Sequence, residues 1–225
     1  PMFPGDLYDT TARIAEQSPP REDAQASTAS YAWSQFLENG WQAIRIPEAF
    51  GGVGASVAEM AAIAEAAGRF GLPSPLVARC AVAPLLLSDC AQSEAIQALL
   101  ADVATGLASV AVAFDTKSAQ TITATPDGAQ LRLNGQLIGV DWSEPATHVL
   151  TAAQGSDGQA LLVLVDAAQL DLSQQQWLGL DDRRVVDLRL DGLAVAASAV
   201  LARGAQAQAL IDQGRSLGAL LISAQ

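Results

Sequence analysis

The sequence has few basic residues: 12 Lys and Arg stand against 24 Asp and Glu, which gives a net charge of −12. Nucleic-acid binding needs a basic face, so this imbalance argues against a nucleic-acid partner. It still permits a small anionic ligand, because one local pocket of cations or backbone N–H groups is enough to bind one.

Cysteine and long apolar runs are also scarce. Cys80 and Cys90 are the only two cysteines. They lie on one expected helical stretch, which favours free, buried thiols over a disulfide.

No apolar run reaches the ~20 residues of a membrane-spanning helix. The first residues lack the basic, apolar and small pattern of a secretory signal. We therefore expect a cytoplasmic protein without a membrane span, and the sequence shows no metal-ligand cluster.

The apolar residues, half of the 225, change their spacing twice along the chain. They repeat with a helical period up to Gly106. From Ser109, short β-prone stretches alternate with Gly, Asp and Pro turns, which indicates an antiparallel barrel or sandwich. The helical period returns after Gly204. This order predicts an α+β fold.

We divide this α+β chain into three domains. Residues 1–106 are expected to form an all-α N-terminal domain, and residues 107–203 an antiparallel β-barrel or sandwich as the middle domain. Residues 204–225 are expected to form the first helix of a C-terminal helical domain, whose remaining bundle is missing from this sequence.

The segment 33–54 combines a helix, a helix-ending Asn39-Gly40 pair and a turn. Apolar residues of 33–37 fall on one helical face. Ile44, Ile46 and Pro47 predict a short buried extended piece, and the glycines of 50–54 predict a tight turn. Directly after it, Ser56 and Glu59 have the spacing of a capping box, which predicts the start of a helix there.

The segment 40–54, GWQAIRIPEAFGGVG, resembles the "GW…IPE.FGG.G" segment of the acyl-CoA dehydrogenase family. Leu133-Asn134-Gly135 is similar to the family's "LNG" hairpin, and Leu178-Gly179 with Arg183 is similar to its "lG.R" segment. Because these pieces also occur in the family's order, the resemblance covers nearly the whole chain.

The resemblance implies an FAD-linked oxidoreductase that acts on the CH–CH bond of an acyl-CoA thioester. A carboxylate removes the α-proton, and the β-hydrogen leaves as hydride to FAD. It also implies a homo- or hetero-oligomer, an electron-transfer acceptor and a role in lipid or steroid degradation. The family includes two-gene enzymes, so this chain can be one subunit beside a paralogue. Two alternatives stay open: a non-catalytic structural partner, and a flavin monooxygenase of the same fold.

The family's flavin loop follows the first β-strand and is rich in glycine and hydroxyl groups. Here the corresponding residues 113–121 are several residues shorter and lack glycine, which limits close backbone approach to a pyrophosphate. Phe114, Thr116 and Ser118 remain as cofactor-binding candidates.

The next strand should bring an aromatic and a hydroxyl side chain to the flavin ring. By position these are Gly139 and Asp141, and a register slip would bring Trp142 and Ser143 instead. Asp141 and Ser143 are therefore further cofactor-binding candidates. An anionic Asp141 would disfavour the reduced, anionic flavin. We expect this chain alone to bind FAD weakly or not at all, with a partner chain supplying the main flavin site.

The catalytic base is unassigned. Some family members carry Glu-Arg on the first helix of the third domain, and the matching pair here is Gly214-Arg215. Gly214 occupies that base position but cannot act as a base, whereas Arg215 is a cofactor-binding candidate. Other members carry the glutamate far downstream. The single histidine, His148, falls on an expected strand, where a structural role is commoner than a catalytic one.

Overall fold

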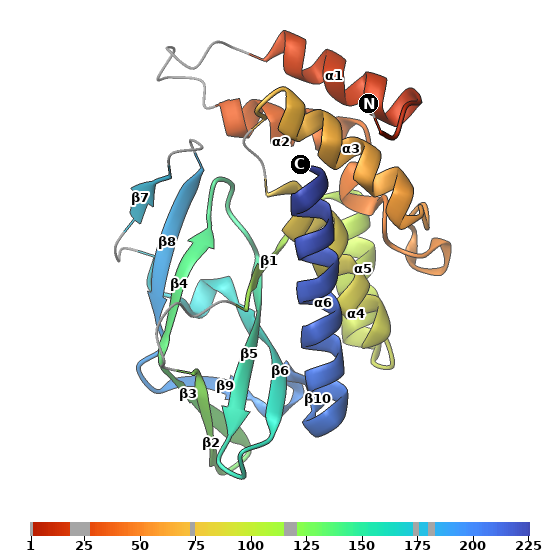
Figure 1. Ribbon diagram of the computed structural model, residues 1–225. Coiled ribbons are helices and arrows are strands. Elements are labelled where there is room, and N and C mark those ends of the chain that lie inside the picture. Colours follow the sequence, from red (N-terminus) through yellow and green to blue (C-terminus); the bar gives the residue numbers. More distant parts are fainter. Residues whose placement is uncertain (1, 19–27, 73–74, 115–120, 173–175, 180–182) are drawn as a thin grey trace.

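The computed structural model describes residues 2–18, 28–72, 75–114, 121–172, 176–179 and 183–225 (Figure 1). Helices form the first part of the chain. They are α1 Asp6–Gln17, α2 Thr28–Glu38, the 3₁₀ turns η1 Trp41–Ala43 and η2 Glu48–Phe50, α3 Val57–Arg69, the π-helical η3 Val77–Val82, α4 Ala83–Asp89 and α5 Glu94–Thr105.

Strands follow from residue 110, and a helix ends the chain. The strands are β1 Val110–Ala113, β2 Thr123–Asp127, β3 Gln130–Asn134, β4 Gln136–Asp141, β5 His148–Gly155, β6 Ala160–Asp166, β7 Gln176–Leu178, β8 Arg184–Arg189, β9 Leu193–Ala196 and β10 Val200–Arg203. The 3₁₀ turns η4 Ala167–Gln169 and η5 Ala197–Ala199 lie between them, and α6 spans Gly204–Ala224. The predicted α+β class is confirmed.

Among the described residues the strands form two sheets. The larger has the order β10-β6-β5-β2-β3-β9, with β1 also paired to β5, and the smaller has the order β4-β8-β7. Most pairs are antiparallel, as predicted. However, β1 and β2 both pair with β5 in parallel, one after the other along its length. Alternation shows that a residue belongs to a strand but does not show the direction of the neighbouring strand, so the sequence could not predict these two pairings.

The larger sheet is buried on both faces, which gives three layers. Along β5, Leu150 packs into a core shared with the helices. Its neighbours Val149 and Ala153 pack into a second core between the two sheets. Because successive strand residues point to opposite faces, one strand serves both cores. This arrangement agrees with the predicted sandwich.

Helix α6 joins the helical and β parts. Figure 1 shows it lying along the larger sheet, on the same side as α4 and α5, with its C-terminal end near α3. Its buried side chains follow a helical period and include Leu210, Leu217 and Leu221. The approach to α3 is close, because a Cβ on Gly68 would meet the backbone of Gln225.

The segment 40–54 differs from the prediction in one respect. Ile44 and Ile46 are buried as expected. They do not lie in an extended piece: Ile44 has helical backbone angles and belongs to a series of turns. The glycine-rich turn is confirmed, and Gly52 explains why it needs glycine. A Cβ there would stand 2.0 Å from the carbonyl oxygen of Ile46, so the turn folds directly onto that backbone.

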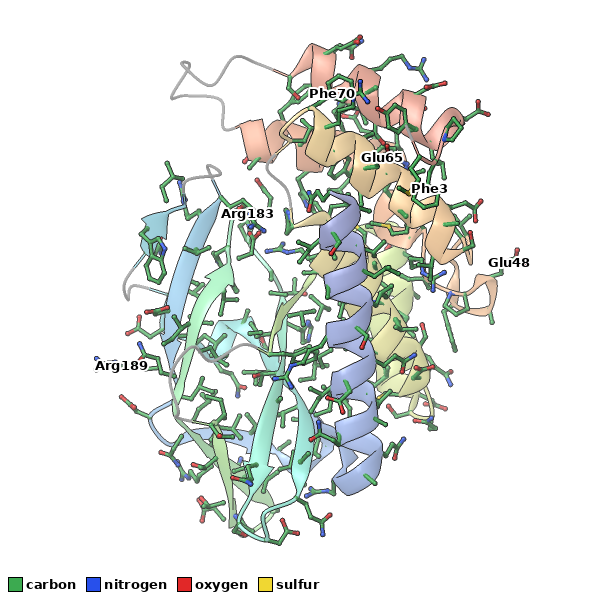
Figure 2. The ribbon with its side chains drawn as sticks, viewed as in Figure 1. Phe3, Glu48, Glu65, Phe70, Arg183 and Arg189 are labelled. Carbon is green, nitrogen blue, oxygen red and sulfur yellow. The ribbon has the colours of Figure 1, made fainter. Side chains whose placement is uncertain are left out.

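Hydrogen bonds fix the N-terminal end of α3 and the segment that precedes α1. The predicted capping box is present: the Glu59 N–H donates to Ser56 Oγ at 3.2 Å, and the Ser56 N–H donates to Glu59 Oε2 at 2.7 Å. Further along α3, the Glu65 carboxylate accepts from the N–H groups of Met2 and Phe3. Figure 2 shows Phe3 beside Glu65, so α3 anchors the segment that leads into α1.

Candidate functional site

A cleft of about 560 Å³ lies where η3, β1, β4 and α6 meet. Apolar and small side chains form most of its wall, and the charged side chains of Asp141, Arg183 and Arg215 are also part of it. The remaining residues lining it are Pro75, Val77, Ala78, Val82, Val112, Ala113, Phe114, Ile138, Gly139, Val140, Gly214, Gly218, Ala219, Ile222 and Gln225.

Three of the six predicted cofactor-binding residues, together with the expected base position, meet at this cleft. Phe114 directly after β1, Asp141 of β4 and Arg215 of α6 all line it, as does Gly214. Thr116 and Ser118 lie outside the described residues. The tertiary fold therefore brings together residues that are up to 101 positions apart in the sequence, such as Phe114 and Arg215.

Ser143 does not join them, since it is absent from the described residues that line the cleft. Its hydroxyl accepts a hydrogen bond from the Arg184 N–H at 3.2 Å, and its own N–H donates to Asp141. Trp142 is buried in the core between the sheets. Of the four residues predicted around the ring position, Gly139 and Asp141 therefore line the cleft, whereas Trp142 and Ser143 do not.

The cause is a register irregularity in β4. The pairing of β4 with β8 shifts between Leu137 and Val140. Gly139 has a φ of 67°, a left-handed conformation that glycine adopts easily. Its N–H donates to Asp187 Oδ1 at 2.8 Å. Such irregularities change the face to which the next side chain points.

The charge of Asp141 is partly compensated. Its Oδ2 lies 3.4 Å from Arg183 Nη1, and its Oδ1 accepts from the Ser143 N–H at 3.0 Å. Figure 2 shows Arg183 just before β8, at the end of the small sheet nearer the N-terminal helices. The negative charge of Asp141, expected beside a flavin ring, is thus paired with the positive charge of Arg183 on the same cleft.

Arg215 contacts the residue that precedes the expected flavin loop. Its Nη2 donates to the carbonyl oxygen of Phe114 at 3.1 Å. The guanidinium belongs to an exposed residue at the rim of the cleft. Because a guanidinium carries several N–H donors, this bond leaves others for an anionic group.

Arg79 is a residue that sequence reasoning missed. It is 2% exposed and lies in η3, between the cleft-lining residues Ala78 and Val82. Burial lowers its pKa, whereas the negative charge of Asp141 opposes that change. An arginine on an apolar helical stretch was the only available signal, since arginine is rarely fully buried without partners.

His148 does not reach the cleft. Its Nδ1 lies 2.9 Å from Thr147 Oγ1, and it pairs across the sheet with Asp166. Burial lowers its pKa, and Asp166 acts in the opposite direction. Among the described residues, no group of three or more His, Cys, Asp and Glu could hold a metal ion. No helix in the described ranges combines the length and apolarity needed to cross a membrane.

The chain resembles known proteins in sequence and in structure. A family described as acyl-CoA dehydrogenase, N-terminal domain, matches residues 6–107. No curated protein matches the chain. A variant of the Tcur3481-Tcur3483 steroid ACAD is 24% identical, with a TM-score of 0.79 over 97% of this chain and 60% of that one.

Two further solved structures share the fold. The ChsE4-ChsE5 complex from Mycobacterium tuberculosis is 20% identical, with a TM-score of 0.82 over 96% of this chain and 61% of that one. A glutaryl-CoA dehydrogenase from Mycobacterium smegmatis in complex with FADH2 is 18% identical, with a TM-score of 0.76 over 96% of this chain and 60% of that one. This chain thus spans about 60% of the length of the chains that it matches. Residues 6–107 thus match the acyl-CoA dehydrogenase N-terminal domain, and the chain as a whole shares the fold of these solved structures.

Proposed function

We propose that this chain is a subunit of an FAD-linked acyl-CoA dehydrogenase and that its cleft contributes to the site of flavin and acyl thioester. The observation that carries the proposal is the convergence of Phe114, Asp141 and Arg215 on one largely apolar cleft. FAD, when bound, would supply the hydride acceptor for α,β-dehydrogenation.

The residues present fit a flat, amphipathic ring better than a whole dinucleotide. A cleft of about 560 Å³ lies within the usual size range of small-molecule pockets. Gly139 leaves open space on one wall, because a Cβ there would have no atom within 4 Å. Apolar side chains from η3, such as Val77 and Val82, would exclude water from the ring or from an acyl chain.

This chain holds no base at the position where some family members carry one, because Gly214 stands there. A carboxylate from elsewhere would have to remove the α-proton. Its source would be a helix beyond residue 225 or a paralogous partner chain. The similarity to the ChsE4-ChsE5 complex supports the second source, and the similarity to the Tcur3481-Tcur3483 steroid ACAD supports a bulky, steroid-like thioester.

A partner surface is also part of this proposal. Leu220 and Ile222 of α6 are 56% and 62% exposed, and Ile222 also lines the cleft. Large exposed apolar side chains can mark an interface, so we propose that α6 packs against another helix of an oligomer or of the remaining domain. We further propose the domain division 1–106, 107–203 and 204–225 and a cytoplasmic location, with an electron-transfer protein as the final acceptor.

The test is a flavin titration followed by its visible absorbance. The full chain is titrated with FAD alone and after co-expression with a paralogous chain that has a glycine-rich flavin loop. Arg215→Ala should weaken flavin binding about tenfold, the loss of one charge-assisted hydrogen bond. Arg132→Ala is the matched control, since Arg132 is an exposed arginine paired with Asp127. Equal binding by both variants would contradict the proposal.

A non-catalytic structural partner is the second candidate. The observation that favours it is the packing at Gly214, which excludes a base side chain there. In that case the chain would stabilise its paralogue without flavin of its own. Full flavin content in the paralogue alone, with a stability gain only on mixing, would support this candidate. Substrate-dependent oxygen consumption would instead indicate the flavin monooxygenase.

A further inference from the structure

Arg79 connects the two walls of the cleft. On one side, Val77, Ala78 and Val82 of the same π-helical element line the cleft. On the other side, Asp141 ends the β4 wall. Arg79 itself does not line the cleft, but its guanidinium extends from the first wall to the segment that follows the second.

The four terminal N–H groups of Arg79 all have partners. Nη1 donates to Ser109 Oγ at 3.0 Å and to the Pro145 carbonyl at 3.1 Å. Nη2 donates to the carbonyls of Glu144 at 2.5 Å and Asp141 at 3.3 Å. Three of the four acceptors thus belong to residues 141–145, which comprise the last residue of β4 and the turn that leads to β5.

The rest of the guanidinium is enclosed. Its central carbon lies 5.6 Å from the centre of a Trp33 ring, within the range of a cation–π contact. Its Nε is buried without a hydrogen-bond partner among the described residues. Burying a cation costs free energy unless its hydrogen bonds are satisfied. The buried position of Arg79 is therefore stable only while residues 141–145 keep their present conformation.

We infer that Arg79 is a positioning residue that holds residues 141–145 against η3 and so fixes the width of the cleft. Lysine cannot replace it. The planar fork of arginine places four N–H groups toward separate acceptors, whereas the ammonium group of lysine has three N–H groups at one point. The part of the inference that concerns ligand binding rests on the proposed flavin site, and the part that concerns the turn does not.

The first experiment needs no ligand. Hydrogen exchange is measured by mass spectrometry on the peptide 141–147 in Arg79→Lys, Arg79→Met and the unchanged chain. We expect about tenfold faster exchange or more in both variants, because the carbonyls lose all charged donors in Arg79→Met and a single ammonium group cannot reach the separate acceptors in Arg79→Lys. The matched control is Arg45→Met, since Arg45 donates to the Ala55 carbonyl and also has a buried, unpaired Nε in the described structure.

The comparison with Arg45→Met separates positioning from general stability. That control should speed exchange around residues 44–55 and leave 141–147 unchanged. If Arg79→Met does not fold, Ser109→Ala removes a single acceptor of the guanidinium and should speed exchange in 141–147 by a smaller factor. Unchanged exchange of 141–147 in every folded Arg79 and Ser109 variant would overturn the inference.

The second experiment measures flavin affinity by titration of the same variants. Arg79→Lys should bind FAD about tenfold more weakly than Arg45→Met, because the wall at Asp141 is no longer held. If neither the variants nor the unchanged chain binds FAD, the proposed function fails. The hydrogen-exchange result still decides whether Arg79 holds residues 141–145. Equal FAD affinity in Arg79→Lys and Arg45→Met, with faster exchange of 141–147 only in Arg79→Lys, would refute the inference that Arg79 fixes the width of the cleft.

Discussion

The ring of Phe114 lies so close to Gly214 that a Cβ on the glycine would stand 3.1 Å from Phe114 Cε2. The same Cβ would lie 3.0 Å from Leu86 Cδ1 and 3.2 Å from Val82 Cγ1. Three elements therefore converge on this glycine. The missing base is accompanied by packing that fills the space a base would need.

We predict that Gly214→Glu destabilises the chain and does not create a dehydrogenase. The new side chain has to displace three packed side chains, which costs about 1–3 kcal/mol of the free energy of unfolding. Urea unfolding measures this loss. Gly218→Ala is the control, because its Cβ would make an ordinary contact of 3.7 Å with Val82. A fully stable Gly214→Glu chain that dehydrogenates an acyl-CoA would contradict the prediction.

A second prediction concerns the charge of Asp141. Asp141→Asn keeps an oxygen for the Ser143 N–H but loses the ion pair with Arg183. Because that pair is partly exposed, we expect only about 0–1 kcal/mol of lost stability. If flavin is bound, its reduction potential should rise, since a negative charge disfavours the reduced anion.

The measurement is a redox titration of the flavin in two variants. Asp127→Asn is the control, because Asp127 also pairs with an arginine, Arg132, but does not line the cleft. We expect a positive shift in Asp141→Asn and no shift in Asp127→Asn. The same potential in both variants would show that Asp141 does not act on the ring.

A third prediction uses the single histidine of the chain. Burial lowers the pKa of His148, so the folded state binds its proton less readily than the unfolded state. The free energy of unfolding should therefore fall as the pH decreases from about 6.5, the ordinary histidine value. The loss should stop growing below the lowered pKa.

Urea unfolding across this pH range tests the point. In His148→Gln the slope just below about pH 6.5 should flatten, because the carboxylates titrate at lower pH. A slope of equal size in both proteins would assign it to other groups.

A fourth prediction concerns the thiols. Both cysteines are free and buried, as predicted. Burial raises the pKa of Cys80 to about 12 and that of Cys90 to about 11. Because the thiolate is the reactive form, neither should react with Ellman's reagent at about pH 8 in the folded chain. Both should react in urea, and rapid labelling of the folded chain would contradict their burial.

The site could be predicted only in part from the sequence. The expected positions of Phe114, Asp141 and Arg215 depend on matching short segments to a family, and all three line the cleft. Ser143 is close to Asp141 in sequence, but it lies beyond the end of β4, where its hydroxyl accepts a hydrogen bond from the Arg184 N–H and does not line the cleft. Arg79 could not be found, because its acceptors are mostly backbone carbonyls, which every sequence contains.

The sequence by itself determined the order of helices and strands, the capping box at Ser56 and the buried, free cysteines. These features depend on local periods and on neighbours within a few residues. Only the tertiary structure decided the parallel pairing of β1 with β5, the bonds of Arg79 and the contact between Phe114 and Gly214. Those features join residues far apart in the chain, and such contacts form only when packing selects one arrangement of the layers.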